Sequence, residues 1–407
     1  AVPADGLFTV DLALAGTTHR QYFRCLPPDF PRLDVERTGA TDAGWYLTTL
    51  GVSNPDATPF LVILDHRGAP VWYKRAATQV LDLKRLSNGT LAFTPLLGAA
   101  FGVDPERGYV VTNLLGSLIA ERTTDDPAAL PVDHHDYVEV PGGGWALVSY
   151  PLVRNRDLTG LGAGYFADDS IVDGTIQELS PTGTEVWRWD ASAHFDVTDA
   201  AFPQRFGLYP GEPHGGEVDL WHINSIQRVS GGDYVVSARH LDAIFRVDRS
   251  SGDVEWTLGG LPTVPNQLTI VGDPLDGPRR PHHATLTGDV LTLFDNRAGT
   301  GQPARAVAYR VDASAMTATL LWQIDEPMGR SSFGLGSTQV TPDGSRLASW
   351  GGLQPMIEEY ATDGQRLLRI TQPDGLTTYR VLKYAPSAFN AAQLRATAGG
   401  SVELPGN

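Results

Sequence analysis

The sequence is poor in cysteine, in lysine and in long apolar runs, and each shortage excludes a class of protein. Its 407 residues contain one cysteine, Cys25, so neither an intrachain disulfide nor a CxxC metal or redox motif can form. Three lysines contribute to 31 basic residues against 47 acidic ones, and a formal charge of −16 argues against a nucleic-acid groove. No apolar run approaches the roughly 20 residues of a bilayer span. We therefore expect a soluble protein with no membrane span and no nucleic-acid partner.

The chain begins "AVPADG" without a methionine. Exported proteins look like this after a signal peptide is removed at a small residue, so we expect a secreted protein. The acidic balance still leaves room for an anionic substrate in one local arginine-lined pocket.

A recurring hairpin element organises the chain. Each copy places a polar turn with Gly or Asp before a β-branched or aromatic run. The copies are "LDHRGAPVWY" (64–73), "TNLLGSLIAE" (112–121), "LSPTGTEVWRW" (179–189), "VDRSSGDVEWTL" (247–258), "VDASAMTATLLW" (311–322) and "YATDGQRLLRI" (360–370).

A second hairpin type alternates with the first and begins near residues 81, 135, 224, 283 and 337. Two hairpins make a four-stranded sheet, and repeats of this kind indicate a β-propeller. A sixth unit combines the N-terminal strands "GWYLTTLG" and "PFLVILDHRGAPVWYK" with the C-terminal "YRVLKYAP" (379–386). The prediction is an all-β, six-bladed β-propeller over 41–390, closed by N- and C-terminal strands. A short N-terminal β segment or cap (1–40) precedes it, and a tail (391–407) follows.

Three stretches do not fit the repeat, namely 151–172, 191–218 and 259–280. Long irregular insertions on a rigid scaffold tend to form the walls or lid of a site.

Histidines mark the first strands of three consecutive units. His135 lies seven residues before Gly142, His222 nine before Gly231, and His283 five before Gly288. Because these offsets differ by two, the period of a strand, all three side chains should leave the same face. Arg239 ends the strand that returns beside His222, so it should join them.

Each of these residues alone fits a hydrogen-bonded strand-end histidine, but an apolar core has no need of the whole cluster. Three imidazoles could hold a metal with an open position. Alternatively, one imidazole acts as nucleophile or base while Arg239 neutralises an oxyanion. No Asp, Glu or Cys has a clear ligand spacing beside them, so we favour the second chemistry and predict no metal and no cofactor. His134, His214 and His282 are further candidates, while alternation assigns His282 to the loop side and His240 to packing.

The stretches "DLWHINSIQRVSGGDYVVSARHLDAIFRVDRSSGDVEWTLGG", "HHATLTGDVLTLFDN" and "ATLLWQIDEP" resemble the arylsulfotransferase family, in particular its actinobacterial and fungal-type branch. The resemblance covers roughly residues 60–385. It implies transfer of a sulfuryl group from an aryl sulfate donor to a hydroxyl acceptor through a sulfohistidine, without a nucleotide donor. By the resemblance His283 would be the nucleophile, Arg239 would bind sulfate oxygens, and His135 with His222 would move the proton. Asn224 and Asn296 would support them.

Two features differ from that family. Its best-studied members carry a larger N-terminal domain that pairs subunits and a disulfide near the site, so we expect a monomer or weak oligomer here. Members often carry Gln before the nucleophile, whereas this chain has His282. Because fold alone does not fix function, a β-propeller lyase or glycoside hydrolase on an anionic glycan and a non-catalytic binding propeller remain alternatives.

Overall fold

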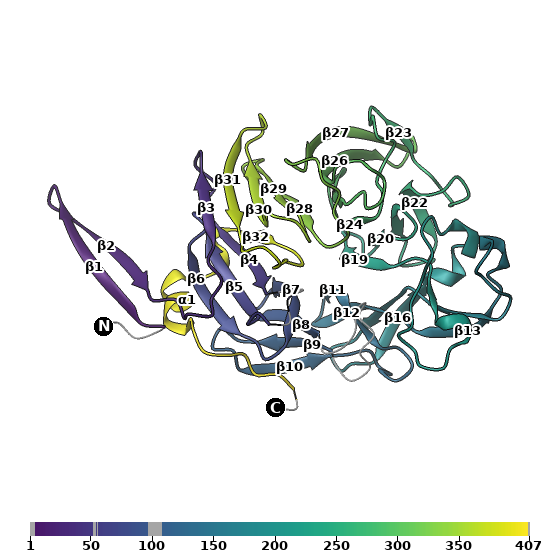
Figure 1. Ribbon diagram of the computed structural model, residues 1–407, viewed down its shortest axis with the longest axis horizontal. Coiled ribbons are helices and arrows are strands. Elements are labelled where there is room, and N and C mark those ends of the chain that lie inside the picture. Colours follow the sequence, from purple (N-terminus) through teal and green to yellow (C-terminus); the bar gives the residue numbers. More distant parts are fainter. Residues whose placement is uncertain (1–4, 52–53, 55, 97–107, 406–407) are drawn as a thin grey trace.

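The computed structural model describes residues 5–51, 54, 56–96 and 108–405, and its regular structure is almost entirely β-strand (Figure 1). One α-helix, α1 (Ala391–Thr397), occurs in this part of the chain, together with single-turn 3-10 helices at Thr159–Leu161, Ala191–Ala193, Val197–Asp199, Pro213–Gly215 and Pro386–Ala388. No helix among the described residues has the length and apolar character to cross a bilayer.

Six sheets of four or five mostly antiparallel strands make up the body of the described chain. In spatial order, the first sheet contains β10 (Leu118–Arg122), β9 (Tyr109–Thr112), β8 (Leu91–Leu96) and β7 (Gln79–Arg85), and the second contains β11 (Val132–Val140), β12 (Gly144–Ser149), β15 (Thr175–Leu179) and β16 (Glu185–Asp190). The third sheet contains β19 (Ile223–Arg228), β20 (Tyr234–Ala238), β21 (Ala243–Val247) and β22 (Val254–Gly259), and the fourth contains β23 (Thr269–Val271), β27 (Thr317–Asp325), β26 (Arg305–Asp312), β25 (Val290–Asp295) and β24 (Pro281–Thr287). The fifth sheet contains β28 (Ser337–Val340), β29 (Arg346–Ser349), β30 (Ile357–Tyr360), β31 (Arg366–Thr371) and β3 (Asp34–Arg37), and the sixth contains β32 (Leu382–Tyr384), β4 (Trp45–Leu50), β5 (Phe60–Asp65) and β6 (Pro70–Arg75).

The strand pairing agrees with the expected repeat. The predicted starts of the second hairpin type fall in or beside β7, β11, β19, β24 and β28. The C-terminal strand β32 pairs with the N-terminal strand β4, with Leu382 opposite Leu47. Local turn chemistry drives these hairpins: Gly89, in the turn between β7 and β8, has a φ of 88° that suits a residue without a Cβ.

The first strands of the sheets surround a common centre (Figure 1). Strand β7 contacts β4 and β11, β11 contacts β19, β19 contacts β24, β24 contacts β28, and β28 contacts β32. Side chains near the beginnings of these strands are therefore close in space although they are far apart in the sequence.

The insertions at 151–172 and 191–218 contain a sheet that the sequence did not predict. Its strands are β13 (Leu152–Arg156), β14 (Asp169–Val172), β18 (Val218–Asp219) and β17 (Gln204–Arg205), and β14 pairs with β18 in parallel. These strands are two to five residues long and pair across long separations, so they have no local hairpin signature. The last residue of strand β18, Asp219, lies three residues before His222 in the chain.

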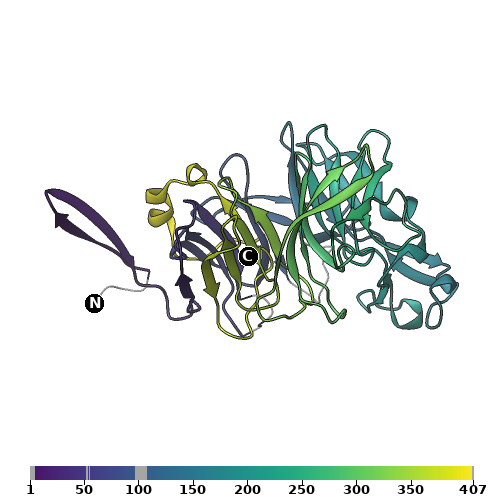
Figure 2. The ribbon, with the colours of Figure 1, turned by 90° about the horizontal axis from the view of Figure 1, so that it is seen from above.

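The N-terminal hairpin of β1 (Leu7–Leu14) and β2 (Thr17–Arg24) projects from the body rather than packing on it as a cap (Figure 2). Every residue of β1 is exposed. Strand β3, which also lies within the predicted segment 1–40, instead pairs with β31 at the edge of a sheet in the body.

Candidate active site

Histidines cluster where three neighbouring first strands begin. His135 belongs to β11, His222 directly precedes β19, and His282 is the second residue of β24. The ring centroids of His135 and His222 are 4.8 Å apart, and the rings meet edge to face. Burial lowers the pKa of His282 well below its usual value, and the charge of Arg239 and the rings of His222 and His135 lower it further. These four side chains therefore share one site.

The position of His283 corrects the prediction from strand alternation. Strand β24 pairs regularly where His282 lies opposite Phe294, but the register shifts before Thr285, which lies opposite Thr292. Residues 283 and 284 thus oppose a single partner residue, and His283 takes a left-handed backbone with φ of 49°. This bulge interrupts the two-residue period, so His282 rather than His283 joins His135 and His222.

His283 faces a different set of side chains. It lines a cavity of about 340 Å³ together with Lys84, Asp136 and Arg380. Its Nδ1 accepts a 3.4 Å hydrogen bond from the backbone N–H of Thr338. Burial, followed by the charge of Arg380, lowers its pKa to about 3. Because Lys84 and Arg380 each form ion pairs with Asp136, His283 is a neutral residue beside a buried ion network.

A hydrogen bond to Asn296 fixes the tautomer of His282. The Asn296 side-chain N–H donates to the carbonyl of Leu335 at 3.0 Å, which directs its Oδ1 toward His282. This Oδ1 lies 2.7 Å from His282 Nδ1 and can only accept, so the ring proton sits on Nδ1. The Nε2 atom of His282 therefore carries a lone pair. A Cβ at Gly334 would lie 3.8 Å from that Nε2, so a residue without a side chain borders it.

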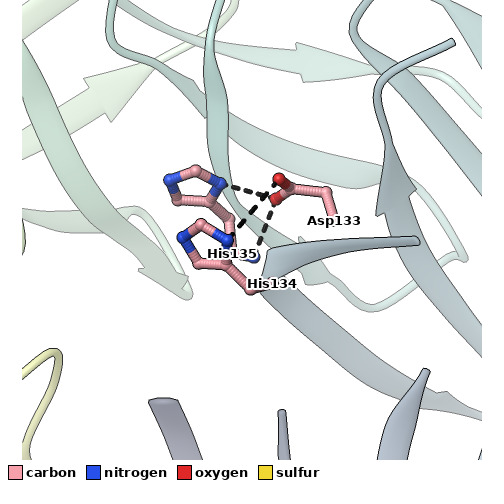
Figure 3. A group of neighbouring side chains, drawn as sticks. All are labelled: Asp133, His134 and His135. Atoms are coloured by element: carbon pink, nitrogen blue, oxygen red, sulfur yellow. Dashed lines mark hydrogen bonds and ion pairs between the residues drawn. The ribbon is translucent and has the colours of Figure 1, made fainter. Parts of the chain in front are cut away.

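Asp133 orients His135. One carboxylate oxygen of Asp133, Oδ1, lies 2.5 Å from His135 Nδ1 and accepts the His135 backbone N–H at 2.7 Å. Figure 3 shows the carboxylate facing one nitrogen of both His135 and His134, whose stacked rings direct their other nitrogens the same way. Burial lowers the pKa of His135 to about 3 and raises that of Asp133 to about 8.

Asp219 orients His222 in a similar arrangement. Its Oδ2 lies 2.5 Å from His222 Nδ1, and its Oδ1 accepts the His222 backbone N–H at 2.9 Å. Burial by itself raises the pKa of Asp219, but the adjoining His240 and His222 outweigh it and hold that pKa well below its usual range. Burial lowers the pKa of His222 to about 3, although Asp219 opposes that change.

Arg239 is held by two neighbours. Its Nη1 donates to His240 Nε2 at 2.8 Å, and its Nη2 donates to the carbonyl of Phe333 at 2.9 Å. Burial and then the charge of Arg280 lower its pKa to about 10. Both guanidinium groups lie over the ring of Phe202, with Arg280 Cζ at 4.1 Å and Arg239 Cζ at 5.6 Å from its centroid. The insertion that carries Phe202 thus positions two cations at the site.

The remaining predicted residues fall into different surroundings. His134 stacks on His135 with ring centroids 4.2 Å apart. Asn224 donates to the carbonyl of Pro281 at 2.7 Å and so ties β19 to the start of β24. His214 lies in the insertion, where its Nε2 is 2.8 Å from Asp168 and its ring stacks on Phe166. Within the described residues, these contacts of His214 lie in the insertion and not in the histidine cluster.

Two groups in the site offer the ligand types of a metal centre, Asp133 with His134 and His135, and Asp219 with His222 and His240. In both groups the carboxylate already contacts a histidine Nδ1 at 2.5 Å. A metal would have to displace those contacts, whereas proton transfer uses them as they are.

Sequence reasoning missed four residues of this site, which are Asp133, Asp219, His240 and Arg280. A signal existed for the two carboxylates, because an Asp precedes each histidine by two or three residues in "DHH" and "DLWH". His240 was assigned to packing on the opposite face, but its ring stacks on His222 at 4.7 Å and its Nδ1 lies 2.9 Å from the Asp219 carbonyl. Strand β20 ends at Ala238, so His240 lies beyond it and the two-residue alternation of a strand does not determine which way its side chain points.

Comparisons with known proteins place the chain among relatives. The sequence model of one family, described as Arylsulfotransferase (ASST), matches residues 34–373. A search of curated proteins finds no match. Similar solved structures include a protein of unknown function from Bacteroides caccae (10% identity, 84% of this chain and 99% of that chain covered, TM-score 0.48). Others are virginiamycin B lyase from Staphylococcus aureus (12%, 91% and 94%, 0.39) and the β-propeller domain of Cps50 (Swd1) from Myceliophteria thermophila (11%, 83% and 88%, 0.39).

Proposed function

Since the chain belongs to the arylsulfotransferase family, we propose that it moves a sulfuryl group from an aryl sulfate ester to a phenolic or other hydroxyl acceptor, with His282 as the nucleophile. The family favours this activity over the lyase, hydrolase and non-catalytic alternatives, for which neither the site nor the comparisons add support.

One observation carries the proposal, namely the lone pair on His282 Nε2 beside a guanidinium. Asn296 holds the proton on Nδ1, and burial keeps the ring neutral. A neutral imidazole nitrogen with a fixed orientation is a competent nucleophile at neutral pH. The charge of Arg239 lowers the pKa of His282, and we propose that the same charge stabilises the sulfate group under attack.

The proposed reaction has two steps. The Nε2 of His282 attacks sulfur, the bond from sulfur to the aryl oxygen breaks, and the leaving phenolate takes a proton. In the second step the acceptor hydroxyl loses a proton, its oxygen attacks sulfur, and the S–N bond to His282 breaks. The enzyme thus carries the group as a sulfohistidine between two small molecules and needs no nucleotide.

Arg239 is proposed to bind the sulfate oxygens. His240 and the carbonyl of Phe333 take two of the five N–H donors of the guanidinium, and we propose that others face the oxygens of the substrate. The two neighbours fix the plane of the group before substrate binds, which avoids reorganisation during the reaction. Arg280, whose guanidinium also lies over the ring of Phe202, adds a second positive charge.

We also propose that the six sheets of the body are the blades of a closed six-bladed propeller. The contacts between successive first strands and the pairing of β32 with β4 support this closure. It would place the site at the central mouth, where the first strands begin.

The test is to incubate the protein with p-nitrophenyl sulfate and an acceptor phenol, and to follow nitrophenolate release. We expect release that depends on the acceptor, and a protein mass increased by one sulfuryl group when the acceptor is omitted. Peptide mapping should place this group on His282.

His282→Ala should abolish both signals, whereas His283→Ala, a substitution of the neighbouring residue, should keep the sulfated intermediate. Sulfation lost with His283→Ala but kept with His282→Ala would show that the nucleophile is misassigned. A folded wild-type protein that releases no phenol from any aryl sulfate tried would argue against the activity itself.

A further inference from the structure

The two Asp–His pairs of the site differ in how their carboxylates are satisfied. Both oxygens of Asp219 face histidine donors: Oδ2 contacts His222 Nδ1, and Oδ1 accepts the His222 backbone N–H and lies 3.6 Å from His240 Nδ1. In Asp133, one oxygen, Oδ1, takes both contacts with His135. The other oxygen, Oδ2, is buried without a hydrogen-bond partner among the described residues, and His134 Nδ1 lies 4.0 Å from it.

This difference favours opposite protonation states. An ionised carboxylate with one buried, unpaired oxygen is costly, and protonation removes most of that cost. His134 Nδ1 is itself buried without a partner, so it does not supply the missing donor. Asp219 has the donors that an anion needs. The pKa directions agree with the geometry, since burial raises the pKa of Asp133 to about 8 while His240 and His222 lower that of Asp219 against the effect of burial.

The protonation of each carboxylate determines the tautomer of its histidine. An ionised Asp219 accepts the Nδ1 proton of His222, so the lone pair of that ring is on Nε2. A protonated Asp133 donates its own proton to Nδ1 of His135, so the ring proton of His135 is on Nε2. His135 therefore has a proton to give in the resting enzyme, and His222 does not.

We infer that Asp133 and His135 form the single proton-carrying pair of the reaction, with the carboxyl group of Asp133 as the proton store. The inference rests on the proposed function. The family resemblance assigns proton transfer to His135 and His222 together, whereas this inference assigns it to His135 alone. Asp133 acts through His135 and is a positioning residue, while His135 touches the reacting oxygen.

The proton balance of the cycle closes on this pair alone. As the S–O bond breaks, the Nε2 proton of His135 passes to the phenolate oxygen, and the Asp133 proton passes to Nδ1. This leaves an ionised carboxylate and a lone pair on Nε2 of His135. In the second step Nε2 takes the proton of the acceptor hydroxyl, and Nδ1 returns its proton to Asp133. The same pair thus acts as the acid in the first step and as the base in the second. This is expected because the second sulfuryl transfer, to a hydroxyl, is the chemical reverse of the first, from an aryl ester.

The test compares Asp133→Asn and Asp219→Asn on a series of aryl sulfates whose phenols span weak to strong acids. Asparagine cannot store a proton, so Asp133→Asn should slow sulfation from phenyl sulfate about 10²-fold, but slow p-nitrophenyl sulfate, whose phenolate leaves unaided, only a few-fold. Asp219→Asn should slow every donor by a similar factor. Asp168→Asn, which changes an Asp–His pair in the insertion, is the matched control and should leave all rates unchanged.

Infrared difference spectroscopy gives a readout that does not need turnover. The wild-type protein and Asp219→Asn should show a protonated carboxyl C=O band at neutral pH that is missing in Asp133→Asn. If the band is absent while His282 is still sulfated, the inference fails and the proposed function stands. If the band is present and no histidine is sulfated, the proposed function fails and the catalytic role falls with it.

Two further outcomes would overturn the inference. One is a steeper dependence on the leaving group in Asp219→Asn than in Asp133→Asn. The other is a stoichiometric divalent metal in elemental analysis that is lost in Asp133→Asn, because a metal ligand would have to be an ionised carboxylate.

Discussion

The low pKa of the buried imidazoles leads to a prediction about the acid side of the rate profile. Burial lowers the pKa of both His135 and His222 to about 3, and lowers that of His282 well below its usual value. A lowered pKa keeps the nucleophile neutral as the pH falls. We therefore expect the rate of His282 sulfation to stay level between pH 7.5 and pH 5.5.

The magnitude follows from the fraction of neutral imidazole. With an ordinary pKa of about 6.5, only about a tenth of the rings would be neutral at pH 5.5, and the rate would fall about tenfold. Because burial holds the pKa of His282 well below its usual value, almost all of its rings remain neutral at that pH. The two cases differ by about an order of magnitude, far more than the error of a rate measurement.

The assay is single-turnover release of phenol from p-nitrophenyl sulfate, quenched in alkali so that all nitrophenol is ionised when it is read. Circular dichroism at each pH checks that the protein is still folded. A rate that declines with an apparent pKa between 6 and 7, in protein that remains folded, would refute the reasoning, because it would mean that His282 is solvated like a surface histidine.

Four other predictions concern single residues or the whole fold. Asn296→Ala removes the acceptor that fixes the His282 tautomer and should slow sulfation about 10- to 100-fold, while Asn296→Asp should restore much of the rate. Rapid-quench mass spectrometry measures sulfation in both variants. Equal rates in these two variants and the wild type would contradict the assigned role of Asn296. Gly334→Val places methyl groups beside His282 Nε2 and should slow sulfation about 10²-fold with little change in the free energy of unfolding; a fast, normally folded variant would show that substrate approaches from elsewhere. Arg305→Ala leaves Asp273 and Asp295 without their shared buried arginine and should cost about 3–5 kcal/mol in urea unfolding. Arg310→Ala, at the exposed pair with Asp289, should cost less than about 1 kcal/mol. Similar losses in both variants would be inconsistent with this account. The free energy of unfolding should fall as the pH drops below about 6.5, because His134, His135, His222 and His283 bind protons in the unfolded chain but, with pKa values near 3, not in the folded one. Asp133, whose pKa is raised to about 8, opposes this loss, but it is one group against four. Urea unfolding at pH 7.5 and 6.0 measures the difference, and constant stability would contradict the prediction.

The sequence was sufficient for the features that depend on neighbouring residues. Gly-containing turns and two-residue alternation located the hairpins, and with them the starts of β7, β11, β19, β24 and β28. The order of hairpins predicted that β32 would pair with β4. His135, His222 and Arg239 were also predicted to meet, since each stands next to a strand end that the local pattern could locate.

Tertiary structure alone decided which of the neighbours His282 and His283 takes part in the site. A bulge at residues 283 and 284 depends on the partner strand β25, so alternation could not show that His282 rather than His283 joins the cluster. Asp219 stands three residues before His222, but the fold also brings it His240, which is 21 residues further along the chain. The pKa directions come from burial, which is a property of the packed sheets. The sequence by itself thus determined which residues start the strands, and only packing between strands distant in the chain determined which way their side chains face and which of them hold a proton.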